Sequence, residues 1–307
     1  MIHEIQQKLD NSFRKEIPDS NSVIFHFNGK KVLCRYDMIN PFPTAFDFHM
    51  KNYAIKDAQG LVYLFTIGDR KYFLLREYIA AVLDVSYIYI DVKQFRSIED
   101  MDRTQVFALA TAWHLNQWYD STAFCGYCGG TTVICHKERA VKCSFCGKKV
   151  FPRINPAVIV GVTNGDKLLI TRYAEKRGVP YDTLIAGFTE IGETPEETVQ
   201  REVMEEVGLR VKNIRYYKSQ PWGYTGCVLM GFFCDLDGDS TITMDKSELS
   251  SAEWVQRDEI KAQPDDLSLT NDMMMIFRNF PAQNSEVLTL SDIILEHNKK
   301  VYEELAK

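Results

Sequence analysis

Short apolar runs bounded by turn residues predict β-strands in the first third of the chain. These runs occupy residues 23–27, 31–34, 61–65 and 72–75. Residues 28–29 (Asn-Gly) and 68–69 (Gly-Asp) separate the two pairs of runs, and both dipeptides favour tight hairpin turns. Residues 97–118 carry apolar side chains at helical spacing. Since no catalytic constellation occurs here, we predict that residues 1–118 form a scaffold or dimerisation domain.

Beyond residue 156 strand and helix signatures alternate, which is typical of an α/β domain. Residues 158–162 are an apolar run of strand length. Near the carboxyl end, Ser291-Asp292 precedes apolar residues at helical spacing, which predicts a capped amphipathic helix within a tail of residues 281–307. No run reaches the roughly 18 apolar residues of a membrane helix, and the first residues lack the pattern of a secretory signal. We therefore expect a cytoplasmic protein without a membrane partner.

One helix is predicted by its ends as well as by its apolar stripe. At its start, Thr194 is the N-cap and forms a capping box with Glu197 at the third helical position, while Pro195 occupies the first. At its end, Gly208 follows the last turn. Val199, Val203 and Val207 recur every four residues and predict the buried face. The sequence therefore predicts a helix from Pro195 to about Val207.

This helix also carries Glu202, Glu205 and Glu206, whose spacing places their carboxylates on one face. Three like charges repel one another, and a hard divalent cation such as Mg²⁺ or Mn²⁺ would relieve that repulsion. An ordinary solvated acidic face is the alternative for these three residues taken alone. Arg201 can offset part of the charge, and we expect it to pair with Glu193 in the preceding loop.

Composition and cysteine spacing add a second kind of site. The chain has 307 residues, 45% of them hydrophobic and 25% charged, which is ordinary for a soluble protein of two or three modules. Four of its eight cysteines form two CxxC pairs, Cys125/Cys128 and Cys143/Cys146, separated by residues 129–142. Two such knuckles close a tetrahedral four-thiolate shell, and zinc is its usual occupant. We therefore predict one structural zinc in residues 119–152.

The other cysteines do not complete a pattern of this kind. Cys135 and His136 lie between the knuckles and could be spare ligands, but four thiolates already fill the shell. Cys34, Cys227 and Cys234 are interpreted as small core residues.

The formal net charge of −6 argues against a protein that holds nucleic acid mainly by electrostatics. A locally basic set lies around the cysteines, namely Lys137, Arg139, Lys142, Lys148, Lys149 and Arg153. A solvated charged surface is the commoner meaning of such a set. We expect any activity on RNA to require only the 5′ end.

The segment from Gly187 to Leu209 resembles the Nudix box, G-x5-E-x7-R-E-U-x-E-E-x-G-U with U aliphatic, at every specified position. Those positions include Gly187, Glu193, Arg201 and Gly208, besides the three glutamates of the helix. The resemblance implies an α/β/α sandwich around a mixed sheet. It also implies hydrolysis of a nucleoside diphosphate that is linked to another group.

The same resemblance assigns metal ligands and catalytic roles. Glu202 and Glu206 would be the main Mg²⁺ or Mn²⁺ ligands, Glu205 an additional one, and either Glu205 or Glu206 would help to deprotonate the attacking water. The backbone carbonyl of Ala186 and the distal Glu248 would complete the sites of two or three ions. Glu253 is the alternative to Glu248.

A zinc ribbon directly before a Nudix domain is similar to the NADH pyrophosphatase branch, which includes enzymes that remove NAD caps from RNA. Gln220-Pro221-Trp222 stands after the box as in that branch, and an amide and an indole would suit a nucleotide. The branch continues with a PFP motif, whereas this chain continues with Gly223 to Cys227. Tyr224 keeps an aromatic ring there. The departure leaves open a preference for ADP-ribose or another dinucleotide.

Three more substrate contacts are implied by the resemblance: Glu138 in the ribbon, Phe151 where the branch has a tyrosine, and Phe188 as a base-stacking ring. A buried core role is the alternative for Phe188. A homodimer is implied too.

We therefore expect an α+β multidomain chain. It would comprise an N-terminal Nudix-like α/β domain (1–118), a zinc ribbon (119–152), a catalytic Nudix sandwich (153–280) and a helical tail (281–307). The leading hypothesis is hydrolysis of NAD(H) to NMN(H) and AMP, with NAD-capped RNA 5′ ends as a further substrate. A non-catalytic nucleotide sensor is the alternative of another class, and such a protein would be expected to lose box carboxylates.

Overall fold

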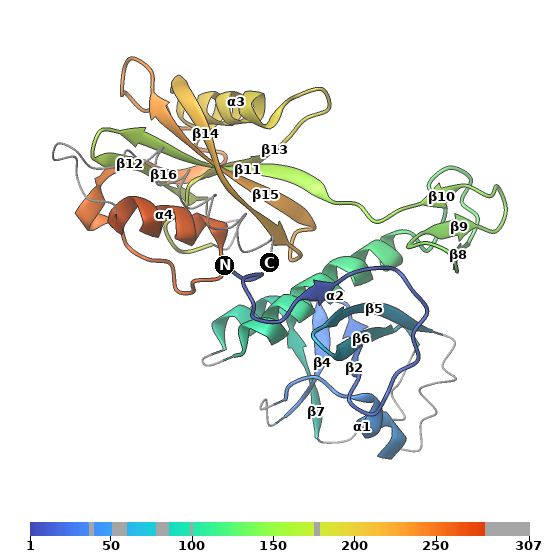
Figure 1. Cartoon of the computed structure of the whole chain (residues 1–307). Coiled ribbons are helices and arrows are strands. Elements are labelled where there is room, and N and C mark those ends of the chain that lie inside the picture. The colour runs from blue at the N-terminus through green and yellow to red at the C-terminus, as the bar shows by residue number, and fades with distance from the viewer. Residues whose placement is uncertain (37–39, 51–59, 78–85, 99–100, 175–178, 280–307) are drawn as a thin grey trace. The chain divides into compact units, whose positions relative to one another are not determined.

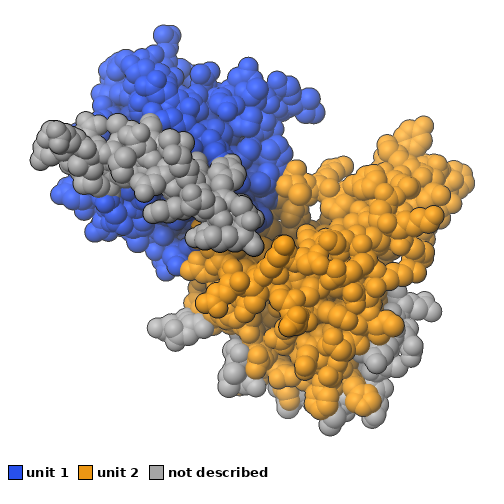
Figure 2. Space-filling model, viewed as in Figure 1, with its two compact units in different colours: residues 1, 155–221, 227–307 blue, residues 2–154, 222–226 orange. Residues whose placement is uncertain are grey.

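The computed structural model describes residues 1–36, 40–50, 60–77, 86–98, 101–174 and 179–279. The chain forms two compact units, which Figure 2 shows in different colours. Unit 1 contains residue 1 together with residues 155–221 and 227–307, and unit 2 contains residues 2–154 and 222–226. The amphipathic helix predicted near the carboxyl end lies outside the described residues.

Unit 2 begins with two small sheets. The first has the strand order β1 (Leu9–Asp10), β5 (Leu61–Ile67), β6 (Arg70–Leu75), β2 (Val23–Phe25), and the second has the order β3 (Phe27–Asn28), β4 (Lys31–Arg35), β7 (Tyr87–Asp91). Both predicted hairpins form, because β5 pairs antiparallel with β6 and β3 with β4. The helices of this unit are α1 (Ala45–Met50), the 3-10 helix η3 (Val92–Ser97) and α2 (Arg103–Ser121).

The apolar run at residues 23–27 forms two strands instead of one. It divides at His26, since β2 runs parallel to β6 in one sheet while β3 pairs with β4 in the other. The His26 ring is buried and bonds with the Glu77 carbonyl at 2.9 Å and the Tyr89 hydroxyl at 2.8 Å. Burial lowers the pKa of His26, which favours a neutral ring that donates to the carbonyl and accepts from the hydroxyl.

Helix α2 begins later than the apolar spacing predicts. It starts at Arg103 because Asp102 is its N-cap and accepts a hydrogen bond from the Thr104 amide at 2.9 Å. The expected start near Ser97 was wrong, since residues 92–97 form the short helix η3.

The ribbon follows α2 in the chain (Figure 1) and consists of β8 (Thr132–Ile134), β9 (Val141–Cys143) and β10 (Lys149–Val150). These strands form one antiparallel sheet. Arg139 ties it to the rest of unit 2, because its guanidinium donates to the Leu64 carbonyl at 2.6 Å and to the Asn11 side chain at 3.1 Å.

Unit 1 is built on one mixed sheet with the order β14 (Val211–Trp222), β15 (Cys227–Leu236), β11 (Asn155–Asn164), β12 (Lys167–Tyr173), β16 (Leu249–Gln256). A sixth strand, β13 (Ile185–Phe188), also pairs with β11. Strand β11 runs parallel to β15 and antiparallel to β12 and β13. The apolar run at residues 158–162 lies within β11, as predicted.

Two helices cover the two faces of this sheet, so the predicted α/β/α sandwich is confirmed (Figure 1). Helix α3 (Pro195–Val207) packs in a core cluster with Val158, Val160 and Phe232. Helix α4 (Leu269–Asn279), which follows the short helix η5 (Arg257–Glu259), packs in a second cluster with Ile159 and Phe233. Neighbouring side chains along β11 therefore point to opposite faces of the sheet.

Among the described helices, none combines the length and the apolar character that crossing a bilayer requires.

Candidate active site and zinc site

Helix α3 forms as its sequence predicts. The Thr194 hydroxyl accepts from the Glu197 amide at 3.2 Å, and the Glu197 carboxylate accepts from the Thr194 amide at 2.7 Å, so the capping box is complete. Gly208 ends the helix with a φ of 70°, a left-handed conformation that favours glycine. The stripe of Val199, Val203 and Val207 is fully buried. The helix is therefore held at both ends and along one side.

Arg201, in the middle of this helix, is the centre of a charged cluster. Its guanidinium binds both oxygens of Glu193, at 2.6 and 2.9 Å, which confirms the expected pairing. It also donates to Glu202 at 2.7 Å, to Glu205 at 3.1 Å and to the Phe188 carbonyl at 2.8 Å. The bond from Arg201 lowers the pKa of Glu193 to about 2. Arg201 thus connects the loop, the helix and the end of β13.

Gly187 of β13 leaves the space that the Glu202 carboxylate occupies. A Cβ atom at position 187 would lie 1.9 Å from Glu202 Cδ and 2.0 and 2.3 Å from its two oxygens. Strand β13 is fixed here, because Gly187 pairs with Val158 of β11. Burial raises the pKa of Glu202, and a cation bound beside this carboxylate would oppose that shift by stabilising its charged form.

The three box glutamates differ in depth. The Glu205 side chain is 60% exposed and that of Glu202 is 13% exposed, whereas Glu206 is buried at 4%. Helical spacing places them on one side of α3, but Glu206 faces the protein while Glu205 faces solvent. Within the described ranges, the cysteine quartet alone brings three or more Cys, His, Asp or Glu ligands close enough to share one ion.

The remaining expected ligands lie on other elements. Ala186 precedes Gly187 on β13 and pairs with Ile159. Glu248 stands just before β16, where its carbonyl accepts from the Ala174 amide at 2.9 Å, while Glu253 lies within β16 opposite Ile170. The donors are carboxylates and a carbonyl, the oxygen ligands that Mg²⁺ and Mn²⁺ prefer. Together with the space beside Gly187, this donor set fits a hard divalent cation.

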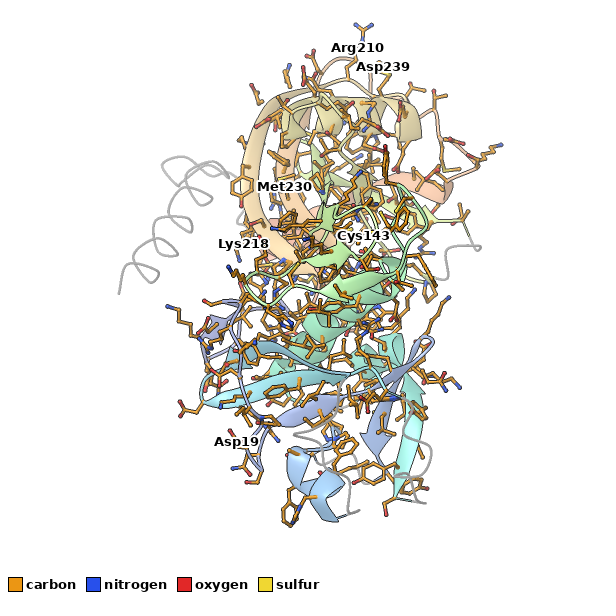
Figure 3. All side chains as sticks on the ribbon, turned by 90° about the vertical axis from the view of Figure 1, so that its right-hand side faces the viewer. Asp19, Cys143, Arg210, Lys218, Met230 and Asp239 are labelled. Atoms are coloured by element: carbon orange, nitrogen blue, oxygen red, sulfur yellow. The ribbon has the colours of Figure 1, made fainter. Side chains whose placement is uncertain are left out.

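The four predicted zinc ligands come together. All four sulfur atoms lie within 4.8 Å of one another, with Cys125 to Cys146 at 3.7 Å and Cys128 to Cys143 at 3.5 Å. Tetrahedral bonds of about 2.3 Å place sulfurs about 3.8 Å apart, so this shell fits zinc. The Cys146 amide donates to the Cys143 sulfur and lowers the pKa of that thiol to about 6. Cys143 lies on β9 and is labelled in Figure 3.

Cysteines outside the quartet do not belong to this shell. Cys135 and His136 are not among its members, as expected. Cys34, Cys227 and Cys234 are buried core residues, which confirms their interpretation.

Gln220 has a different role from the expected one. Its side chain is fully buried, and its amide donates to the Leu267 carbonyl at 2.8 Å and accepts from the Leu269 amide at 2.8 Å. The expectation that this amide binds a nucleotide was wrong in this structure, since backbone groups take both of its ends. Gln220 instead fixes β14 to the start of α4.

The two aromatic residues after Gln220 pack against each other within unit 2. Trp222 and Tyr224 meet edge to face at a centroid distance of 5.3 Å. The Arg96 guanidinium lies over the Trp222 ring at 4.8 Å and over the Tyr224 ring at 5.9 Å. Pro221, which precedes this group, is exposed. Sequence reasoning missed Arg96, because no local pattern links η3 to a motif so far along the chain.

The turn after Trp222 approaches helix α2 closely. A Cβ atom on Gly223 would lie 2.1 Å from the Ala110 carbonyl oxygen. The glycine that replaces the first proline of the family motif is therefore required by this contact.

Three further residues are expected to contact the substrate, and the structure gives the exposure or the ion pair of each. Phe188 at the end of β13 is 54% exposed, which excludes the alternative of a core residue. Phe151 is 52% exposed. Glu138 pairs with Lys149 within the ribbon at 2.5 Å.

This chain is similar to several known proteins. The family model described as the NUDIX domain matches residues 153–273. A NAD-capped RNA hydrolase NudC from Klebsiella pneumoniae is 37% identical over 174 residues, which cover 57% of this chain and 67% of that protein. The corresponding hydrolase from Pectobacterium atrosepticum is 39% identical over 175 residues, covering 57% and 66%. A NUDIX hydrolase structure from Nitrosomonas europaea aligns with a TM-score of 0.39 at 26% identity, covering 45% of this chain and 79% of that one.

Proposed function

This chain belongs to the Nudix hydrolases, and on that premise we propose that it hydrolyses the diphosphate linkage of NAD(H) to give NMN(H) and AMP. We further propose that it removes NAD caps from RNA 5′ ends, the activity that the names of its relatives state. In both cases one water molecule adds across the P–O–P bond, so each side of the cleaved linkage keeps one phosphate: NMN(H) on one side, and AMP or the 5′-monophosphate end of the RNA on the other.

The observation that carries the proposal is the arrangement around Gly187. Glu202 lies against a glycine that no larger residue could replace without moving the carboxylate, while Arg201 holds Glu193, Glu202 and Glu205 in one cluster. Like charges are gathered here at a cost to folding, which a structural helix would avoid. Such a site fits catalysis better than a solvated acidic face does.

The bound ions and the residues of the chain would have different roles in the hydrolysis. Divalent ions supply charge neutralisation on the diphosphate and a bound water with a lowered pKa. Glu202, Glu205, Glu206, Glu248 and the Ala186 carbonyl would hold two or three of them. Glu206, buried at 4%, is the carboxylate best shielded from bulk water, and we assign it the proton of the attacking water.

Arg201 would keep the box carboxylates from spreading apart, since it reaches three of them at once. It acts on the chemistry through its neighbours and is a positioning residue.

Aromatic rings are further proposed contacts of the substrate. Phe188 presents its ring next to Gly187, and Trp222 and Tyr224 form a second aromatic group under the Arg96 cation. Phe151, Glu138 and Pro221 are further proposed contacts. Zinc would have a structural role only, because four thiolates leave no open coordination position. A homodimer is also proposed.

The test is chromatographic product analysis of the purified protein with Mg²⁺ or Mn²⁺ and, separately, NADH, NAD⁺ and ADP-ribose. NMN(H) plus AMP, formed faster than products of ADP-ribose, is the expected result. Faster cleavage of ADP-ribose would overturn the substrate and identify the turn from Gly223 to Cys227 as the decisive departure. Binding of NADH without any turnover would favour a nucleotide sensor.

A matched pair of variants tests the helix. Glu206→Gln should abolish turnover while NADH still binds. Glu196→Gln, an exposed carboxylate of the same helix outside the cluster, should leave turnover unchanged. Full activity in Glu206→Gln would refute the assignment of the metal-binding helix.

A further inference from the structure

The metal end of the ribbon presents two aromatic rings to solvent. Tyr127 lies between the cysteines of the first knuckle and is 76% exposed, and Phe145 lies at the same position of the second knuckle and is 86% exposed. Folding gains little from rings this exposed, because hydrophobic stabilisation requires removal of surface from water. Both knuckles surround one four-sulfur site, so both rings belong to the same end of the ribbon.

We propose that this end of the ribbon binds single-stranded RNA. The knuckle surface, which we define as Tyr127, Phe145, Lys142 and Lys148, would stack bases on its two rings and contact phosphates through its two lysines. The idea rests on the proposed function in one respect only, because it assigns the bound strand to the RNA body that follows a 5′ cap.

The charge of the ribbon matches an RNA strand. Residues 124–154 contain the six cations Lys137, Arg139, Lys142, Lys148, Lys149 and Arg153 and only one carboxylate, Glu138. This leaves five positive charges, and a zinc centre with four thiolates, at −2, still leaves three. The whole chain has a formal charge of −6, so the ribbon is a local exception.

Lysine and aromatic groups alternate at the knuckles themselves. The second knuckle reads Lys142-Cys-Ser-Phe145-Cys-Gly-Lys148-Lys149, and no acidic residue occurs in either knuckle. The Lys148 ammonium lies 5.2 Å from the centroid of the Tyr127 ring, which brings a cation from one knuckle over the ring of the other. Combined cations and stacking rings are typical of surfaces that bind single strands.

The rings are presented on a fixed backbone. The Phe145 amide donates to the Cys143 sulfur at 3.4 Å, and the Tyr127 amide bonds to Cys125 in the same way. A Cβ atom on Gly130 would lie 2.9 Å from the Phe145 Cβ and 3.2 Å from the Cys143 sulfur, so the loops are packed closely. Binding would therefore immobilise side chains but little backbone, which lowers the entropic cost.

An RNA strand fits these observations better than a protein partner does. A protein interface is depleted in lysine at its core, whereas here lysines lie among the aromatic rings. The exposed aromatics thus revise the expectation, based on net charge, that only the 5′ end of an RNA matters.

The test measures RNA binding separately from hydrolysis. Fluorescence anisotropy would follow the zinc-loaded, full-length protein with an unstructured, uncapped RNA about 12 nucleotides long, which spans several stacking sites. Tyr127→Ala and Phe145→Ala should each weaken binding roughly fivefold to a hundredfold. Tyr127→Trp and Phe145→Trp should retain it. Lys142→Gln with Lys148→Gln should reduce the salt dependence by about one to two released ions.

Controls separate this surface from the rest of the protein. Tyr36→Ala, which removes a 72% exposed tyrosine elsewhere in unit 2, should not change RNA affinity. Zinc content and turnover of NAD should be unchanged in all knuckle variants, while kcat/KM for NAD-capped RNA should fall in step with affinity. If the protein does not cleave NAD at all, the binding result still decides the inference by itself.

Three results would overturn the proposal. The first is that the wild-type protein does not bind the RNA. The second is that the affinity of the double variant Tyr127→Ala/Phe145→Ala stays within twofold of wild type. The third is that the variants lose affinity for a fully paired duplex as much as for the single strand. A change of sedimentation in that double variant with unchanged RNA affinity would make the surface a protein interface instead.

Discussion

Replacing Gly187 with alanine should separate catalysis from folding. The added Cβ would lie 1.9 Å from Glu202 Cδ, and ordinary contact begins at 3.4 Å, so the carboxylate must move by about 1.5 Å, the difference between the two. Strand β13 cannot yield easily, because Gly187 is paired with Val158 inside the sheet. The end of the glutamate side chain must move instead.

The catalytic cost of such a shift is large. A misplacement of about 1 Å in a catalytic group can lower the rate about a hundredfold, equivalent to about 2.7 kcal/mol of barrier. We therefore expect kcat of Gly187→Ala to fall at least about a hundredfold.

The cost to stability should be small. Loss of the partly exposed Arg201–Glu202 pair costs about 1 kcal/mol at most. Alanine in place of glycine within a strand regains about 0.5–1 kcal/mol of backbone entropy. Burial also raises the pKa of Glu202, so movement of its carboxylate toward water relieves an unfavourable charge. The melting temperature should stay within a few degrees of wild type.

The assay combines steady-state hydrolysis of NADH with thermal melts at increasing Mn²⁺. Wild type should gain stability from the ion, and Gly187→Ala should gain much less. Glu202→Asp shortens the side chain by about one 1.5 Å bond and should restore part of the activity in the Gly187→Ala background. Activity within about threefold of wild type in Gly187→Ala, or loss of activity together with the fold, would refute the reasoning.

Four other changes test separate parts of the structure. Gln220→Leu should leave two buried backbone groups unpaired and lower the free energy of unfolding by roughly 1–3 kcal/mol for each, with KM unchanged; denaturant titration measures this. Phe188→Ala should raise KM for NADH roughly two- to tenfold without a change in melting temperature, since the ring is exposed. Because the folded pKa of Glu202 is raised above its ordinary 4.5, ionisation opposes folding at neutral pH. Metal-free Glu202→Gln should therefore melt higher than metal-free wild type at pH 7, and the difference should vanish below about pH 4. Cys143→Ser should abolish zinc binding and unfold the ribbon, seen by metal analysis and circular dichroism.

The parts of the fold that were predictable are those whose signals are local. Helix α3 forms at the expected residues because its caps, Thr194 and Gly208, and its valine stripe all lie within one short segment. The cysteine quartet was predictable for a similar reason, since each knuckle fixes two ligands by itself. The Asp102 cap of α2 was a readable signal of this kind, and apolar spacing alone overlooked it.

The parts that failed depend on distant partners. The division of residues 23–27 at His26 requires β6 and β4, which the run itself does not specify. Gln220 was expected to bind a ligand because of its motif, but its burial is decided by the loop before α4. Helical spacing placed Glu205 and Glu206 on one face, and only the packing of α3 on the sheet makes one exposed and the other buried.

The bond from Arg139 to the Leu64 carbonyl has a practical consequence for dividing this chain into expression fragments. A cut at 118/119 would pass through the last turn of α2 and would strip the ribbon of the carbonyl and the asparagine that accept its guanidinium. In such a fragment the Arg139 guanidinium would lose these acceptors and would be exposed to water instead. A cut between residues 154 and 155 keeps these bonds intact, so the ribbon should be produced and transplanted together with the domain that precedes it.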